Sequence, residues 1–300
     1  MNLLVVGSGQ LSQAIAEAAL GTEVDVLVGG RPELDLTNAP ALRTAVTNAA
    51  PAIVLNAAAY TAVDKAESEP DLAYAVNARG AGHLADVCND LGVPLIHLST
   101  DYVFDGRAER PYREDDPVGP ISVYGRTKFE GEQLVAVACP RHVIVRTAWV
   151  HSPWGTNFVK TILRLAETRL VIGVVDDQLG SPTYAPHLAS ALLAVGRRIA
   201  GAGVQGPWGT YHAVDAGGTT WCGFAREVLR QASRQGLRSA DVQAITAADY
   251  PTAARRPANS RLDCNRLQSI FGLALPDWKT GVVACVERLA RISSAGQHHS

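Results

Sequence analysis

A tyrosine and a lysine four positions apart are the first residues of this chain that could do chemistry together. Tyr124 and Lys128 lie in the stretch VYGRTK, at the start of a predicted helix that follows a proline-rich loop. Positions i and i+4 of a helix share one face, so the phenol and the ammonium could converge on one ligand. A neighbouring ammonium favours the phenolate and lowers a tyrosine pKa, which would suit acid–base catalysis at neutral pH. Because such pairs also occur by chance, this interpretation depends on the motifs around them.

A hydroxyl residue precedes this pair in the chain. Thr100 and Asp101 end the apolar stretch VPLIHLSTD, which is typical of a buried strand. Open parallel sheets bind their ligands at the carboxyl ends of the strands. Thr100 is therefore expected where it could surround a carbonyl group together with Tyr124 and Lys128, although a packing or capping threonine is the alternative.

The glycine-rich stretch GSGQLS, residues 7–12, follows the apolar run LLVV directly. Glycine at a strand-to-helix turn lets backbone N–H groups and the positive end of the helix approach a pyrophosphate, which explains Gly7 and Gly9. Ser12 stands where the G-x-G-x-x-G fingerprint has its third glycine, whose role is helix packing. The loop predicts a dinucleotide site, with a simple tight turn as the alternative.

The second predicted strand, in VDVLVGGR, ends without a carboxylate. An acidic residue usually binds the adenosine ribose of NAD at this place, whereas an arginine suits the 2′-phosphate of NADP. Arg31 therefore favours NADPH, with NADH as the alternative cofactor. The competing interpretation is an arginine that is merely solvated in a loop.

The elements that must position these residues alternate along the chain. Continuous apolar runs (LLVV, VDVLVG, AIVLNAAA, VPLIHLST, HVIVRTAWV) indicate strands buried on both faces. They predict an α/β fold: a Rossmann-type doubly wound parallel sheet with a smaller α/β substrate-binding domain. Predicted helices in the first part cover residues 11–20, 39–49, 66–91 and 122–137.

Beyond about residue 150 this regular alternation weakens. We expect residues 1–150 to form the dinucleotide-binding domain, to which later segments could return. Residues 151–292 are expected to form mainly the substrate-binding domain, with helices near 157–168, 221–236 and 279–291. The polar tail 293–300 is predicted to be disordered.

The overall composition disfavours nucleic acid and membranes as binding partners of this protein. The 300 residues carry 27 basic and 29 acidic side chains in a mixed pattern, which gives no footprint for nucleic acid or for an anionic membrane. No apolar stretch approaches the roughly 18 residues that span a bilayer, and the five cysteines have no CxxC spacing. A cytoplasmic protein with a small-molecule partner is expected.

Motifs along nearly the whole chain resemble the extended short-chain dehydrogenase/reductase family. These are GxGQL, LDLT, NAAAYTAVDKAE, STDYVFDG, PxxVYGRTKxxGE, RTAWV, NFVKTILRLA, DDQLGSPT, YPTAARRPANSRLD and LPDWKTGV. The glycine loop is one residue shorter than the usual pattern of that family, which leaves the geometry at the pyrophosphate open. Within the family the likeness is to reductases of dTDP-linked 4-keto-6-deoxy sugars.

The resemblance implies a role for each matching residue. Thr100, Tyr124 and Lys128 would form the catalytic triad. With Arg31, the implied cofactor site comprises Gly7, Gly9, Gln10, Leu11, Asp35, Leu36, Ala58, Ala59, Tyr60, Thr61, Tyr124 and Lys128. The implied substrate site comprises Thr100, Asp101, Trp149, Asn157 and Arg256. Trp149 could instead be a core residue between domains.

The implied reaction is NAD(P)H-dependent reduction of the C4 keto group of dTDP-4-dehydro-6-deoxy-L-mannose to dTDP-L-rhamnose. Alternatives are a reductase of another nucleotide-linked 4-keto deoxysugar and a non-catalytic regulatory subunit of the same fold. A dehydratase or epimerase is disfavoured, because Asp101 is followed by Tyr102 where dehydratases have glutamate. Some relatives are magnesium-bridged dimers, but no matching glutamates can be assigned here, so no metal and a monomer or homodimer are predicted.

Overall fold

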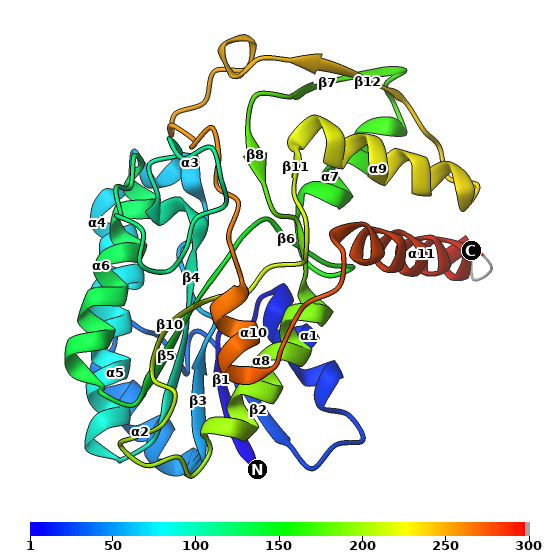
Figure 1. The fold of residues 1–300 in the computed structure, drawn as a ribbon. Coiled ribbons are helices and arrows are strands. Elements are labelled where there is room, and N and C mark those ends of the chain that lie inside the picture. Colours follow the sequence, from blue (N-terminus) through cyan, green and yellow to red (C-terminus); the bar gives the residue numbers. More distant parts are fainter. Residues whose placement is uncertain (298–300) are drawn as a thin grey trace.

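Six parallel strands form the central sheet of the molecule (Figure 1). The computed structural model describes the backbone of residues 1–297 and side chains through residue 293. Across the sheet the order is β10-β5-β4-β3-β1-β2, and each neighbouring pair is parallel. The strands are β1 (Asn2–Val6), β2 (Asp25–Gly29), β3 (Ile53–Asn56), β4 (Leu95–Thr100), β5 (His142–Thr147) and β10 (Gly209–His212).

Two apolar layers cover the faces of this sheet, as the buried runs predict. Side chains alternate along β1, so Leu3 and Val5 enter one layer while Leu4 and Val6 enter the other. The first layer is completed by α1 (Gln10–Ala19) and α8 (Ala185–Ile199), and the second by α2 (Ala39–Ala49), α5 (Gly80–Asp90) and α6 (Val123–Ala138). The doubly wound sheet expected from the sequence is confirmed.

The crossover before β4 differs from the single helix predicted over residues 66–91. It consists of α3 (Val63–Ala66), α4 (Pro70–Tyr74), a π-helical turn at Ala75–Arg79, and α5. Proline cannot continue a preceding helix but suits the first turn of a new one, so Pro70 separates α3 from α4. Asn77 lies buried within the π-helical turn.

A second region packs around its own apolar core above the carboxyl ends of the strands (Figure 1). It contains α7 (Phe158–Ala166), α9 (Trp221–Arg234) and α11 (Trp278–Gln297), with β7 (Val171–Val175) parallel to β12 (Asp241–Ile245). Short strand pairs join β6 (Val150–His151) to β9 (Thr183–Tyr184) and β8 (Leu179–Gly180) to β11 (Thr219–Thr220). A short helix, α10 (Asn265–Phe271), lies against the first region.

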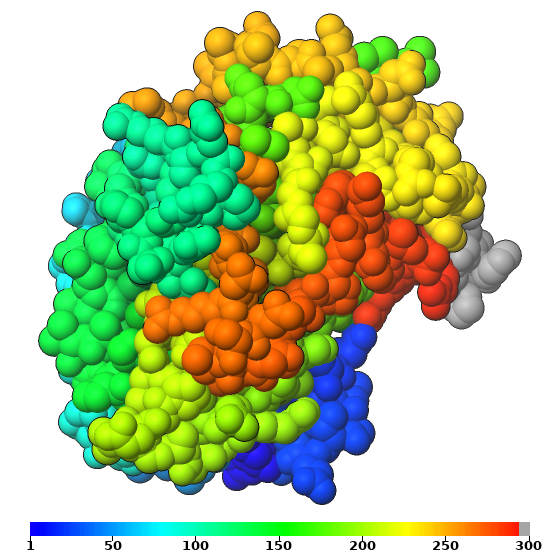
Figure 2. Space-filling model, in the orientation of Figure 1, coloured from blue at the N-terminus to red at the C-terminus, as the bar shows by residue number. Residues whose placement is uncertain are grey.

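The chain passes between the two regions more than once. After β9 it returns to the large sheet as α8 and β10, and β10 pairs with β5. Residues near 260 then contact both regions, because Tyr112 bridges to Leu262 and Leu179 bridges to Asn259. Figure 2 shows the orange and red C-terminal segments across this junction. The predicted boundary near residue 150 stays a prediction.

Two further expectations concern the end of the chain and its helices. Helix α11 continues through Gln297, and residues 298–300 of the predicted disordered tail lie outside the described residues. Among the described residues, no helix combines the length and the apolar character that crossing a membrane requires.

Candidate active site

A cleft of about 590 Å³ opens at the carboxyl ends of the central strands, and we call it the strand-end cleft. Most of the residues predicted for the site line it. They are Gly7, Gly9, Gln10, Leu11, Arg31, Asp35, Leu36, Ala58, Ala59, Thr61, Thr100, Asp101, Tyr124, Lys128 and Trp149. Tyr60, Asn157 and Arg256 do not line this cleft.

The glycine loop presents main chain to the cleft. Gly7 has a φ of +117°, and a Cβ there would lie 2.9 Å from the backbone N of Ala58. A Cβ on Gly9 would meet nothing within 4 Å, so the space in front of this residue is open. Gly9 is the N-cap of α1, and no side chain caps the helix. The free N–H groups at this helix end fit a pyrophosphate.

Arg31 and Asp35 line the strand-end cleft beyond the end of β2. Arg31 is exposed, as a residue that meets a bound phosphate must be before binding. Hydrogen bonds from the N–H and the hydroxyl of Thr37, both 2.8 Å, lower the pKa of the Asp35 carboxyl. The carboxylate of Asp35 therefore already has partners within its own turn, and Arg31 is the basic residue at this end of the cleft.

Asn77 holds the loop after β3 in place, although no sequence motif pointed to this residue. Its Oδ1 accepts from the N–H of Tyr60 (2.8 Å), and its Nδ2 donates to the carbonyl of Tyr60 (3.1 Å) and to Thr127 Oγ1 (3.1 Å). The phenol of Tyr60 donates to Glu69 (2.7 Å) and so does not enter the cleft. A π-helical turn carries no sequence signature that could have identified Asn77.

Thr100 and Asp101 form a buried pair at the end of β4. Thr100 Oγ1 accepts from the N–H of Tyr102 (3.2 Å) and donates to Asp101 Oδ1 (3.0 Å). Both residues are at most 5% exposed. Burial raises the pKa of Asp101 to about 7, against hydrogen bonds that include the one from Thr100. At neutral pH this carboxyl is therefore poised between its neutral and charged forms.

Tyr124 lies in the first turn of α6, opposite Thr100. Ser122 caps the helix by accepting from the N–H of Gly125 (3.1 Å). Burial raises the pKa of Tyr124 to about 12, only partly opposed by its hydrogen bond with Thr100. This direction is opposite to the lowering expected from Lys128. Spacing along the helix predicts proximity, but it does not predict how much water the fold removes from the phenol.

Lys128 is 2% exposed, and its Nζ donates to the carbonyl of Leu98 (2.6 Å). Burial lowers the pKa of this ammonium to about 8, and the nearby Glu132 acts in the opposite direction. Glu132 itself pairs with Arg146 through two hydrogen bonds of 2.9 and 2.7 Å. The Glu132 carboxylate that favours the charged lysine is therefore itself part of a buried ion pair.

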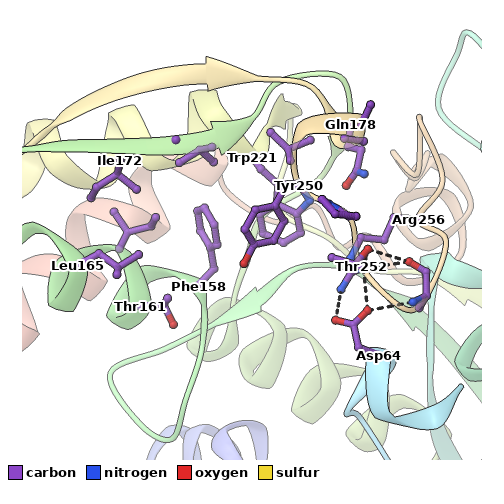
Figure 3. Close-up of a pocket in the computed structure, with 18 of the residues that line it drawn as sticks. Asp64, Phe158, Thr161, Leu165, Ile172, Gln178, Trp221, Tyr250, Thr252 and Arg256 are labelled. Carbon is purple, nitrogen blue, oxygen red and sulfur yellow. Dashed lines mark hydrogen bonds and ion pairs between the residues drawn. The ribbon is translucent and has the colours of Figure 1, made fainter. Parts of the chain in front are cut away.

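A second pocket of about 930 Å³ lies in the second region, between α7, β7 and the loop that follows β12. Figure 3 shows Phe158, Trp221 and Tyr250 together in it, with Leu165 and Ile172 toward one end. At the other end Arg256 pairs with Asp64, and their atoms lie 2.7 and 3.0 Å apart. The pocket combines apolar walls with four arginines, Arg164, Arg169, Arg255 and Arg256.

The structure therefore separates the predicted substrate residues. Thr100, Asp101 and Trp149 line the strand-end cleft, and Arg256 lines the second pocket. Asn157 caps α7, and its amide donates to the carbonyl of Ser152 (2.8 Å) and to Gln10 (3.3 Å). It thus joins the glycine loop to the second region. Phe158, Trp221 and Tyr250 were not predicted as site residues. Phe158 and Tyr250 lie in the motifs NFVKTILRLA and YPTAARRPANSRLD, but their spacing gave no reason to select them, and Trp221 lies outside the quoted motifs.

The geometry of the strand-end cleft is by itself suited to a dinucleotide. The open space at Gly9 and the uncapped start of α1 suit the pyrophosphate, and Ser12 Oγ is buried with no hydrogen-bond partner among the described residues. Among the described side chains, no three His, Cys, Asp or Glu residues are grouped so that they could hold a metal ion. The predicted absence of a metal stays a prediction.

Comparison with known proteins gives consistent matches over almost the full length. The dTDP-4-dehydrorhamnose reductase of Sinorhizobium fredii is 48% identical over 93% of this chain and 94% of its own length. The enzyme of the same name from Escherichia coli K12 is 41% identical over 96% and 98%. A crystal structure of the Bacillus anthracis enzyme in complex with NADP superposes with a TM-score of 0.89, at 34% identity, covering 96% and 99%.

Solved epimerases share the fold at lower identity. UDP-glucose 4-epimerase from Thermus thermophilus, in complex with NAD, superposes with a TM-score of 0.76 at 22% identity, over 97% and 99% of the two chains. The family model described as the RmlD substrate binding domain matches residues 1–291. The glycine loop, the Thr-Tyr-Lys cleft and these matches agree, and the chain belongs to the RmlD substrate binding domain family.

Proposed function

We propose that this chain uses NADPH to reduce the C4 keto group of dTDP-4-dehydro-6-deoxy-L-mannose, which gives dTDP-L-rhamnose. Relatives that are 40 to 48% identical carry the name dTDP-4-dehydrorhamnose reductase. The observation that carries the proposal is that one cleft is lined by Thr100, Tyr124, Lys128 and a glycine loop open to main-chain binding. A carbonyl reductase needs a hydride donor and a proton donor at the same carbon–oxygen bond.

The roles of the residues follow from their chemistry. When bound, NADPH supplies the hydride that C4 receives. Tyr124 donates its phenolic proton to the oxygen of C4 as negative charge develops there, and Thr100 donates a hydrogen bond to the same oxygen. Lys128 binds the ribose next to the nicotinamide. The free N–H groups before α1 bind the pyrophosphate, and Arg31 binds the 2′-phosphate.

We assign the nucleotide half of the substrate to the second pocket. Its volume of about 930 Å³ lies within the usual range for small-molecule sites. Aromatic walls from Phe158, Trp221 and Tyr250 suit a planar base, and Arg256 suits a diphosphate. The sugar half then extends to Thr100, Asp101 and Trp149 in the strand-end cleft.

The decisive experiment is NADPH oxidation by the purified protein when coupled upstream enzymes supply the 4-keto sugar. We expect oxidation that depends on the sugar nucleotide, with dTDP-L-rhamnose identified by mass spectrometry and NMR. The same assay with NADH measures the cofactor preference that Arg31 predicts. A different deoxysugar product would change the assigned substrate, and absence of oxidation with every 4-keto sugar nucleotide tested would reject the proposal.

Three expectations about location, assembly and metal dependence accompany this function. The protein is expected in the cytoplasm, and fractionation followed by immunoblotting tests that. It is expected to be a monomer or a homodimer, which light scattering coupled to gel filtration distinguishes from larger assemblies. Addition of EDTA tests the expectation that no metal is needed for activity.

A further inference from the structure

Two stacked tryptophans separate the strand-end cleft from the second pocket. Trp149 lines the cleft, and Trp221 lines the second pocket. Their ring centroids lie 3.4 Å apart and the planes differ by 7°. Phe158 continues the row on the pocket side, with its ring centroid 4.7 Å from that of Trp221 (Figure 3). A continuous column of aromatic rings therefore connects the two cavities.

The backbone around Trp149 is built specifically for this arrangement. Trp149 has a φ of +47°, in the left-handed region that bulky residues rarely adopt. Gly180 lies against its ring, where a Cβ would approach Cε2 to 2.2 Å. The strand containing Gly180, β8, pairs with β11, which leads directly into Trp221. One strand pair thus supplies the glycine beneath the Trp149 indole and the residue before the second indole.

The stacked pair also differs from the core beneath it. Phe224 is fully buried, and its ring centroid lies 6.3 Å from each of the two indoles. Both tryptophans are only partly buried, because each has a side on a cavity. Backbone strain persists where the surrounding structure enforces it, and it concentrates at functional sites. If these aromatic residues only filled the core, Phe224 would suffice, and Trp149 would not need a positive φ.

We propose that Trp221 is a positioning residue: it holds the Trp149 indole at the wall of the strand-end cleft and transmits occupancy of the second pocket to that wall. The inference rests on the proposed function, because it needs a substrate whose two halves occupy the two cavities. A nucleotide bound against Trp221 would restrain the Trp221 indole. That indole in turn restrains Trp149. The sugar half would then meet a wall already fixed beside Tyr124 and Thr100.

Circular dichroism tests the stack without any turnover. Two indoles in face-to-face contact couple their transitions, and when the two transition dipoles are rotated relative to each other within the stack this coupling gives a paired positive and negative band in the ultraviolet. We expect this couplet in the native protein and its loss in both Trp149→Phe and Trp221→Leu. Trp208→Phe is the matched control, because Trp208 donates to the carbonyl of Gly203 and lines neither cavity. Thymidine diphosphate should change the couplet of the native protein.

Steady-state kinetics tests the positioning role. Trp221→Leu should lower kcat/KM for the sugar nucleotide about tenfold, with the loss partly in kcat, while the Kd for NADPH stays unchanged. Trp221→Phe should recover most of the loss, because it restores a flat ring against Trp149. Trp221→Met replaces the leucine variant if that variant lacks a cooperative thermal transition.

The outcomes separate this inference from the proposed function. A native protein that reduces no 4-keto sugar nucleotide rejects the function, whatever the couplet shows. An active native protein whose ultraviolet circular dichroism is unchanged by both Trp149→Phe and Trp221→Leu rejects the stack. Wild-type kinetic constants in a Trp221→Leu protein that has lost its couplet reject the positioning role, and so does a couplet that thymidine diphosphate leaves unchanged at saturation.

Discussion

The two cavities of this molecule are built in opposite ways. The strand-end cleft is formed mainly by main chain and short side chains where consecutive strands end, as at Gly9, Ala58 and Thr100. The second pocket is formed by long side chains from segments far apart in the sequence, such as Phe158, Trp221 and Arg256. We infer that the cleft depends on backbone geometry, whereas the pocket depends on individual side chains. Substitutions can test this difference.

The largest effect is expected from the side chain that supplies the proton in the strand-end cleft. Tyr124→Phe removes the proton donor but keeps the ring and its edge-to-face contact with Tyr102, whose ring centroid lies 5.9 Å away. We expect kcat to fall by about 10²- to 10⁴-fold with little change in the Kd for NADPH. Turnover assays and a fluorescence titration with NADPH measure the two constants. Unchanged kcat would show that the proton comes from another group.

The glycine loop offers a pair of substitutions that separate folding from binding. Gly9→Ala adds a Cβ that meets nothing within 4 Å, so thermal stability should stay unchanged while the Kd for NADPH rises about ten- to a hundredfold. Gly7→Ala places a Cβ against Ala58 at a φ of +117° and should destabilise the fold by about 1–3 kcal/mol. Thermal melting measures the stability of each variant, and titration with NADPH measures its Kd. Native NADPH affinity in Gly9→Ala would move the pyrophosphate away from this loop.

In the second pocket, side-chain removal should matter instead. Arg256→Ala is expected to raise KM for the sugar nucleotide about tenfold, because a charge-assisted contact to the diphosphate is lost, while NADPH binding stays the same. Arg255→Ala is the matched control, since Arg255 lines the same pocket but is exposed. Equal effects of the two variants would mean that the pocket attracts the substrate by overall charge only.

A smaller, pH-dependent effect is expected from Asp101. Because the pKa of this buried carboxyl is about 7, it gains a negative charge as the pH rises through 7, and this charge raises the pKa of Tyr124. Negative charge there also opposes an alkoxide, so kcat/KM should fall about three- to tenfold across this range. Asp101→Asn should remove that fall but keep the one near pH 8, where Lys128 loses its proton. A native profile that is flat from pH 6 to 7.5 would contradict this assignment.

Much of the cleft could be predicted from the sequence because its chemistry is local. Gly7 and Gly9, Thr100, and the Tyr124–Lys128 pair each lie within a few residues of a strand end or a helix start, where spacing determines direction. The parallel sheet then brings these ends to one edge. The stretch VDVLVGGR predicted Arg31 at the cleft in the same way, and Arg31 lies there.

The remainder could not be predicted, because it depends on contacts between distant segments. The Asp64–Arg256 pair joins residues 192 positions apart, and the stack of Trp149 on Trp221 depends on a glycine in β8. Desolvation is equally non-local, which is why the shift in the pKa of Tyr124 has the opposite direction to the expected one. Tyr60 and Asn157 belong to matching motifs, but hydrogen bonds to Glu69 and to Ser152 and Gln10 hold their side chains outside both cavities.

The return of the chain to the large sheet restricts how this protein could be divided or recombined. A fragment that ends near residue 150 would lack β10, which leaves the backbone of β5 unpaired along one edge. It would also lack α8, which exposes the apolar layer that contains Ile15 and Ile96. A chimera that exchanges substrate recognition between relatives therefore needs at least two separate insertions, on either side of residues 185–212, and not a single crossover point.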